Sequence, residues 1–133
     1  MKQKFKRSFD ELQNIVAMTE AVFHDGELDV SLRNVVDLAT EELFVNMVTY
    51  NTESNEDILI QMLPHEYGLE VSLTDFDVER FDPTGIRNVD VAASLDERTP
   101  GGLGLYLVMK MVDSIHYEYR NRQSKVTFIV DRK

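Results

Sequence analysis

Apolar residues recur along this chain with two different spacings, and the spacings predict helices and strands. Helical spacing predicts helices over residues 8–26, 29–51 and 103–112. Shorter segments, several with alternating apolar and polar residues, predict strands over 2–7, 58–63, 69–73, 114–120 and 125–130. Strands and helices mix without strict alternation. We therefore expect an α+β fold, a two-layer sandwich with about three helices on one face of a mixed or antiparallel sheet.

Local signals support these boundaries. Ser8 and Glu11 have the spacing of a capping box at the start of the first helix. Gly26 is a plausible end, because glycine tolerates a left-handed turn. Turns are expected at 64–68 and 121–124, each between two predicted strands.

The regular pattern is lost from Phe76 to Gly101, where two prolines, Gly85 and many charges occur. Long irregular segments inside a compact domain are uncommon and usually functional, often as lids or binding loops. We expect a lid over 76–101. The whole chain, 1–133, is predicted to be a single domain, since 133 residues is the size of one ordinary domain.

Composition narrows the possible functions. With 14 basic and 24 acidic residues the net charge is −10, which argues against direct nucleic-acid binding and against docking on an anionic membrane. The absence of cysteine excludes disulfides, thiolate metal sites and a cysteine nucleophile. No apolar stretch approaches the roughly 18 residues of a membrane span, and the first residues lack the apolar region of a secretory signal. A cytoplasmic domain is the expectation.

The second predicted helix carries a carboxylate and an amide beside its apolar stripe. Glu42 and Asn46 are four residues apart, so they project from the same side of the helix. Burial without a partner would cost several kcal/mol, which favours a ligand or a hydrogen-bonding neighbour. The alternative is that both bond to nearby backbone or reach solvent.

A glycine cluster directly precedes the last predicted helix. Gly101, Gly102 and Gly104, with Leu103 between them, let backbone amides come close to a ligand at a helix N-terminus. This arrangement is typical of a phosphate site. A flexible hinge or a tight packing turn is the alternative.

Two aspartates follow the strand predicted over residues 69–73. Asp75 and Asp77 lie at the end of a strand, and a carboxylate there can accept a hydrogen bond from an exocyclic amine such as that of adenine. A plain acidic strand end is the alternative.

Taken in this order, these features resemble the nucleotide site of the GHKL ATPase superfamily, with its Bergerat-type fold. The segment from Gly101 to Asp113 is most similar to the anti-sigma-factor serine/threonine kinases, and the resemblance covers nearly the whole chain. It implies ATP and Mg²⁺ as cofactors. Implied roles are Glu42 as general base, Asn46 as Mg²⁺ ligand, Asp75 or Asp77 at the adenine amine with Thr127 supporting through water, and Gly101, Gly102, Leu103 and Gly104 at the phosphates.

The family's adenine box reads Asp-x-Gly, whereas this chain has no glycine there. If Phe81 to Pro83 sets the alignment, Phe76 takes the aspartate position and Val78 the glycine position. A one-residue bulge would instead return Asp75 to the aspartate position and place Asp77 at the glycine; we favour this second alignment. Tyr50 stands where relatives often have a basic residue.

The resemblance implies a protein-serine/threonine kinase that also acts as an anti-sigma factor. Its implied partners are a sigma factor and an anti-anti-sigma protein of the STAS type, whose serine is phosphorylated, and a homodimer is expected. The alternative is a partner-binding module of the same fold that has weak or no ATP binding.

Overall fold

The computed structural model describes residues 1–80 and 102–131. Within these ranges five strands form one sheet: β1 (Lys2–Phe5), β2 (Ile58–His65), β3 (Gly68–Phe76), β4 (Ser114–Arg120) and β5 (Gln123–Asp131). The helices are α1 (Leu12–Asp25), α2 (Arg33–Tyr50) and α4 (Gly102–Met111), and short 3-10 turns precede α1 (Phe9–Glu11) and α2 (Val30–Leu32). The α+β class expected from the sequence is confirmed.

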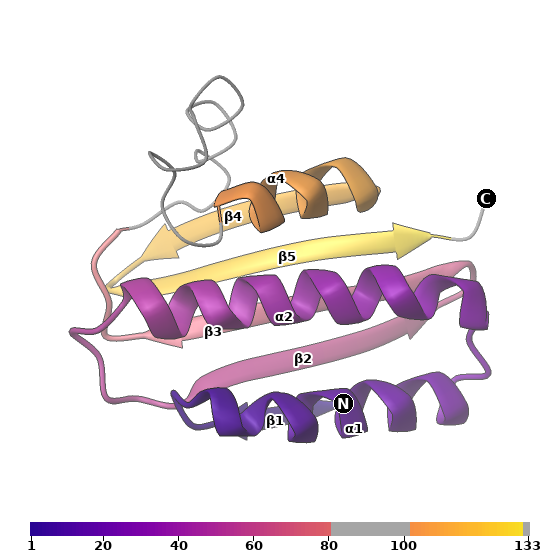
Figure 1. Ribbon diagram of the computed structural model, residues 1–133, viewed down its shortest axis with the longest axis horizontal. Helices are drawn as coiled ribbons and strands as arrows, with labels where there is room; N and C mark the ends of the chain where they lie inside the picture. Colours follow the sequence, from indigo (N-terminus) through magenta and orange to yellow (C-terminus); the bar gives the residue numbers. More distant parts are fainter. Residues whose placement is uncertain (81–101, 132–133) are drawn as a thin grey trace.

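The sheet has the order β1-β2-β3-β5-β4, and every neighbouring pair is antiparallel (Figure 1). The central strand β3 pairs along its whole length with β5, from Gly68 opposite Asp131 to Phe76 opposite Gln123. Because neighbouring side chains alternate between faces, Asp75 lies on the same face of β3 as Val71 and Leu73. That face is the helix-covered one.

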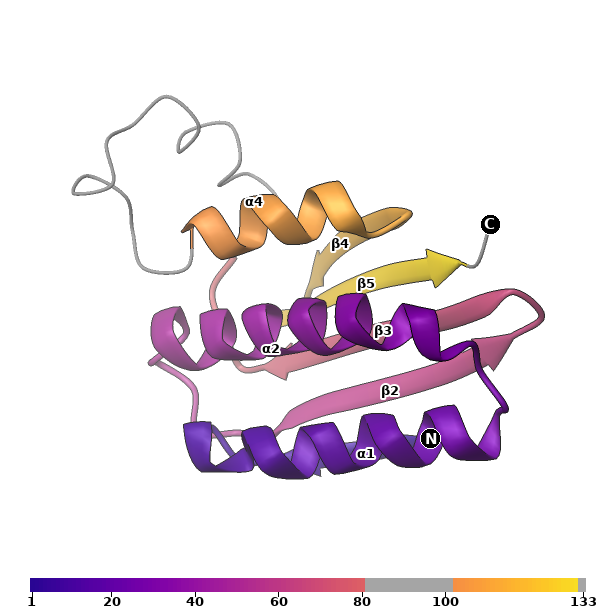
Figure 2. The same ribbon diagram turned by 45° about the vertical axis from the view of Figure 1, so that its right-hand side comes forward.

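All three described helices lie on one face of the sheet, as both views show (Figure 1, Figure 2). The core fills the space between the two layers, and its largest fully buried side chains come from β1, α2, β2, β3, α4 and β5. Burial of this apolar surface is the main stabilising contribution. These side chains are Phe5, Phe44, Phe128, Leu43, Ile58, Ile60, Met62, Leu69, Leu73, Leu105, Val36 and Val71. No helix in the described part of the chain is long and apolar enough to cross a membrane.

The expected capping signal at Ser8 is present in a modified form. The Ser8 hydroxyl accepts a hydrogen bond from the Asp10 amide at 3.1 Å. The Glu11 carboxylate accepts from the Lys6 amide at 2.8 Å rather than from the amide of Ser8. The two bonds fix the turn between β1 and α1, in which Arg7 lies.

The final hairpin is tighter than the sequence suggested. β4 and β5 are joined by Asn121 and Arg122 alone, and both residues have positive φ, 54° and 61°. This pair of left-handed residues is the geometry of a type I′ turn, which matches the twist of the flanking strands. The turn brings Arg122 toward the end of β3.

Regular structure also extends further into the expected lid. Phe76, the first residue of the segment assigned to the lid, is the last residue of β3. The backbone continues in contact with the sheet, since the Val78 amide donates to Arg122 O at 3.0 Å and the Tyr119 hydroxyl donates to Val78 O at 2.8 Å. Residues 81–101, the remainder of that segment, lie outside the described residues.

Candidate functional site

Helix α2 positions the carboxylate and the amide that the sequence singled out. Asn46 lies among the buried residues of α2 and is 4% exposed, while Glu42, one turn earlier, is partly buried. The helix packs against β3 and α4. Both polar side chains thus lie beside the apolar stripe of α2, on the side of the helix that faces the protein interior.

Glu42 reaches the first turn of α4. A Cβ atom added to Gly104 would lie 2.5 Å from Cδ and 2.7 Å from Oε1 of Glu42, far closer than any side chain permits. Gly104 therefore gives the Glu42 carboxyl room against the backbone of α4. This contact brings together two motifs that are about sixty residues apart in the sequence.

The environment of Glu42 changes its proton affinity. Burial, followed by the nearby charge of Glu41, raises the pKa of the Glu42 carboxyl above its ordinary value of 4.5. A carboxylate with a raised pKa is a better proton acceptor at neutral pH than an ordinary one. The shift is in the direction that a general base requires.

The Asn46 amide has an unused polar atom. Its Nδ2 is buried and makes no hydrogen bond to any residue in the described ranges. A half-turn of an amide exchanges its oxygen and nitrogen positions. An amide oxygen at this position fits Mg²⁺, which takes one or two protein oxygens and completes its shell with phosphates and water.

The glycine cluster is described in part. Gly101 lies outside the described residues, Gly102 is the first residue of α4, and Leu103 is the second. The first four backbone amides of a helix have no partner within the helix, and together they carry a partial positive charge. Glu42 thus lies at a helix end that is suited to bind an anionic group.

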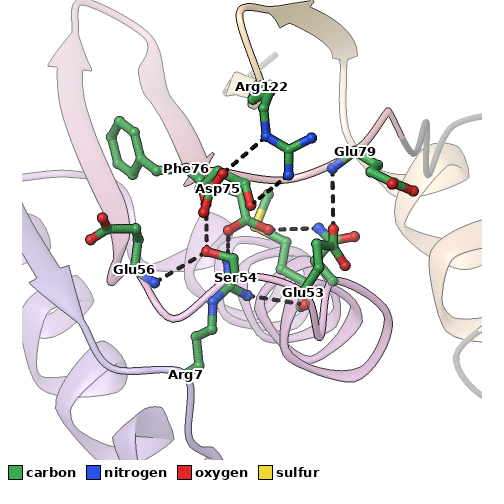
Figure 3. A network of polar contacts seen from close by, with 11 residues as sticks. Arg7, Glu53, Ser54, Glu56, Asp75, Phe76, Glu79 and Arg122 are labelled. Atoms are coloured by element: carbon green, nitrogen blue, oxygen red, sulfur yellow. Dashed lines mark hydrogen bonds and ion pairs between the residues drawn. The ribbon is translucent and has the colours of Figure 1, made fainter.

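Asp75 occupies a different environment from the one expected. Its side chain is fully buried and forms an ion pair through Oδ1 with the guanidinium of Arg7 (Figure 3). Asn51 Nδ2 donates to Asp75 Oδ2 at 2.6 Å. We call Arg7, Asn51 and Asp75 the Asp75 cluster; both oxygens of its carboxylate are engaged by the protein itself.

Neighbouring contacts fix the Asp75 cluster at the end of α2. Asn51 is the C-cap of α2, and its backbone N–H donates to Met47 O. Arg7 Nη1 donates to the same carbonyl at 3.3 Å. Ser54, in the following loop, donates through Oγ to Phe76 O at 2.5 Å (Figure 3). Burial lowers the pKa of Arg7, and the charge of Glu53 acts in the opposite direction.

Asp77 lies outside this cluster and has an unusual backbone. Its φ is 57°, in the left-handed region that glycine adopts most readily. Its exposed carboxylate pairs with Arg122 Nε at 2.9 Å. A residue two positions after Asp75 thus has the backbone conformation that glycine adopts most readily.

The sheet register does not bring Thr127 to Asp75, which corrects the expected arrangement. Thr127 pairs with Ser72, on the face of the sheet opposite to that of Asp75, because odd and even positions of β3 face opposite ways. The residue directly opposite Asp75 is Ser124, which is 2% exposed. The sequence did not single out Ser124 as a neighbour of Asp75. Buried and partly buried residues alternate along β5, and this alternation places Ser124 on the buried face.

Arg7 and Asn51 were also missed. Both lie in or beside predicted element ends, where a charged or amide side chain is ordinarily exposed to solvent. Only the tertiary fold brings the N-terminal segment, the end of α2 and the end of β3 together.

The fold is an α+β sandwich in which α2, with its Glu-x-x-x-Asn pair, packs against α4, whose first turn contains Gly102 and Gly104. Residues 5–130 match the model of the histidine kinase-like ATPase domain. The chain therefore belongs to the histidine kinase-like ATPase family.

Solved structures with the same fold include a chain from the crystal structure of the SiaB–SiaC complex from Pseudomonas aeruginosa. It has 15% sequence identity and a TM-score of 0.68, with 98% of this chain and 88% of that chain covered. The histidine kinase AdeS of Acinetobacter baumannii has 13% identity and a TM-score of 0.52, with coverage of 98% and 67%. No curated protein sequence matches the chain significantly. At these identities the structures show the shared fold.

Proposed function

We propose that this protein is an ATP-dependent protein-serine/threonine kinase of the anti-sigma type. The observation that carries the proposal is the contact of Glu42 with Gly104, which sets a carboxylate with a raised pKa at the N-terminus of α4. Asn46 lies one turn further along α2 with a buried, unpartnered amide nitrogen. Family membership supports nucleotide binding at this position.

Each residue has a separate task in the proposed reaction. Glu42 accepts the proton of a serine hydroxyl as that oxygen bonds to the γ-phosphorus of ATP, while the bond from the γ-phosphorus to the β,γ-bridging oxygen breaks and ADP leaves. Amides in the first turn of α4, where Gly102 and Leu103 lie, hold anionic phosphate oxygens, and Gly104 leaves space for Glu42. The side-chain oxygen of Asn46 would hold Mg²⁺, which would supply neutralisation of phosphate charge.

The proposed partners are proteins. A STAS-type anti-anti-sigma protein supplies the serine, and a sigma factor is sequestered by the same domain, which we propose acts in the cytoplasm as a homodimer. The fold shared with a chain of the SiaB–SiaC complex supports a protein partner. The net charge of −10 is suited to basic segments of a sigma factor.

Calorimetric titration with ATP, with and without Mg²⁺, and phosphate transfer from labelled ATP to a STAS protein test the proposal. Glu42→Gln is expected to retain nucleotide while transfer falls by about 10²–10⁴-fold, the usual contribution of a general base. Asn46→Ala is expected to weaken binding only when Mg²⁺ is present.

Matched controls lie on the exposed sides of the helices. Glu20→Gln changes an exposed carboxylate of α1, and Asn34→Ala changes an exposed amide of α2. Both are expected to behave as the parent. Full-rate transfer by Glu42→Gln would reduce Glu42 to a structural role. An Asn46→Ala variant that binds ATP in the presence of Mg²⁺ as tightly as the parent would remove Asn46 from the metal site.

One observation favours a second candidate, a partner-binding module with weak or no ATP binding. Asp75 is fully buried, and its two oxygens already face Arg7 and Asn51. An adenine amine has no access to the carboxylate in this arrangement. Absence of ATP binding in the parent protein and in variants of the Asp75 cluster would favour the module.

A further inference from the structure

The Asp75 cluster closes the position at which a base amine would bind. Asp75 is 0% exposed, and Arg7 pairs with one of its oxygens (Figure 3). Asn51 Nδ2 donates to the other oxygen at 2.6 Å. An exocyclic amine needs one of those oxygens as its acceptor. One of the two internal partners must therefore leave before the carboxylate can recognise a base.

Asn51 is the more firmly held of the two. It is the C-cap of α2, it is 4% exposed, and its own amide bonds to Met47 O at 3.0 Å. Its position follows from the helix itself, so it moves only if the end of α2 moves.

Arg7 is held through its side chain, by the ion pair with Asp75 and by a bond to Met47 O, and not by a helix cap. It lies between β1 and the first 3-10 turn, its side chain is 12% exposed, and the adjacent Lys6 is exposed. Its bond to Met47 O is long, at 3.3 Å, and its Nε has no hydrogen-bond partner in the described ranges. A long side chain with four rotatable bonds, 12% of which is already exposed, can reach solvent by rotation.

We propose that Arg7 sets the nucleotide affinity of this site: its guanidinium competes with the amine of the base for Asp75. The inference rests on the proposed nucleotide function and adds a residue that controls it. Arg7 reduces the fraction of molecules whose Asp75 is free, and the apparent affinity falls by that same fraction. The competing ligands are those with an exocyclic amine, such as ATP.

Calorimetry with Mg-ATP on the parent, on Arg7→Gln and on Arg122→Gln tests the inference. Arg7→Gln removes the cation and is expected to lower the Kd for ATP by about tenfold or more. A gain of this size follows if at most about one-tenth of the parent molecules have Asp75 free of Arg7, whereas all molecules of the variant do. Arg122→Gln is the matched control, because it removes an exposed Arg–Asp pair at the end of the same strand. Its Kd is expected to equal that of the parent.

Inosine triphosphate separates competition at Asp75 from general loosening. It carries an oxygen in place of the amine, so Arg7→Gln is expected to improve its binding far less than that of ATP. An equal gain for both nucleotides, or an ATP affinity in Arg7→Gln that is unchanged or lower, overturns the inference.

If Arg7→Gln does not fold, the inference can be tested on the parent protein. The side-chain Nε–H signal of Arg7 in NMR, assigned by its absence from Arg7→Lys, is expected to shift and to exchange faster with water on saturation with Mg-ATP. An unchanged signal at saturation refutes the displacement. If the parent binds ATP and Arg7→Gln binds it with the same affinity, this inference fails and the proposed function stands. If neither protein binds ATP, the proposed function fails as well.

Discussion

Breaking the buried pair between Arg7 and Asp75 is expected to be one of the most destabilising single changes in this chain. Arg7→Met keeps most of the side-chain length and removes the charge. It leaves the carboxylate of Asp75, which is 0% exposed, with Asn51 as its remaining partner. Asp75→Asn leaves instead a guanidinium that is 12% exposed and faces a neutral amide.

The magnitude follows from the burial of the pair. Removal of one partner from a buried ion pair typically costs about 3–5 kcal/mol, because the other charge remains without compensation. A domain of this size has about 5–15 kcal/mol of unfolding free energy in total. The expected loss of melting temperature for Arg7→Met is about 10–20 °C. The double variant Arg7→Met/Asp75→Asn is expected to recover most of the loss, since no uncompensated charge remains.

Urea unfolding of the parent, both single variants and the double variant measures the coupling as a double-mutant cycle. Arg122→Gln is the control, because its pair with Asp77 is exposed and such pairs contribute little. An Arg7→Met variant that is no less stable than Arg122→Gln would refute the structural role of the pair. Single variants whose losses simply add would refute the coupling.

Three further outcomes are expected near the site. Gly104→Ala is expected to preserve or raise stability in thermal melting, because alanine favours the helix over glycine by up to about 1 kcal/mol. The same change is expected to lower the rate of phosphate transfer, because the new Cβ displaces the Glu42 carboxyl. Because the pKa of Glu42 is raised in the folded state, the native protein binds more protons than the unfolded chain above pH 4.5, and its stability falls as the pH rises through that window. Glu42→Gln is therefore expected to be more stable than the parent at pH 7, with the difference vanishing in acid, and an advantage that grows in acid would reverse the sign of the argument. Asp77→Val, at a φ of 57°, is expected to be about 1–2 kcal/mol less stable than Asp77→Gly in urea unfolding, whereas equal stability would contradict a left-handed residue there.

The helices and strands could be predicted because their signals are local. The i, i+4 spacing of Glu42 and Asn46 places them on one side of α2 whatever α2 contacts. The antiparallel β4–β5 pair follows from two alternating segments joined by a short polar turn. The same reasoning found the glycines before α4, although not that Gly104 accommodates Glu42.

The cluster at the end of β3 could not be predicted, because its members are distant in sequence. Arg7, Asn51 and Asp75 meet only when β1, α2 and β3 are assembled. Thr127 was placed one residue out of phase, and a shift of one residue moves a side chain to the other face of a sheet. Ser124 would have followed from continuing the buried alternation of β5 backward from Val126.

Stability alone does not account for the charged pair at this position. A pair of well-packed apolar side chains in place of a buried ion pair is often as stable or more stable, since no charge has to be removed from water. The neighbours of Asp75 on its face of β3, Val71 and Leu73, are fully buried apolar residues, so an apolar side chain would suit the same surroundings. A carboxylate here becomes useful once Arg7 can leave, because it then offers an acceptor at the end of the strand, next to the helix that carries Asn46. In the displacement that we propose, the cation compensates that acceptor in the absence of a ligand, and a nucleotide amine would replace the cation on binding.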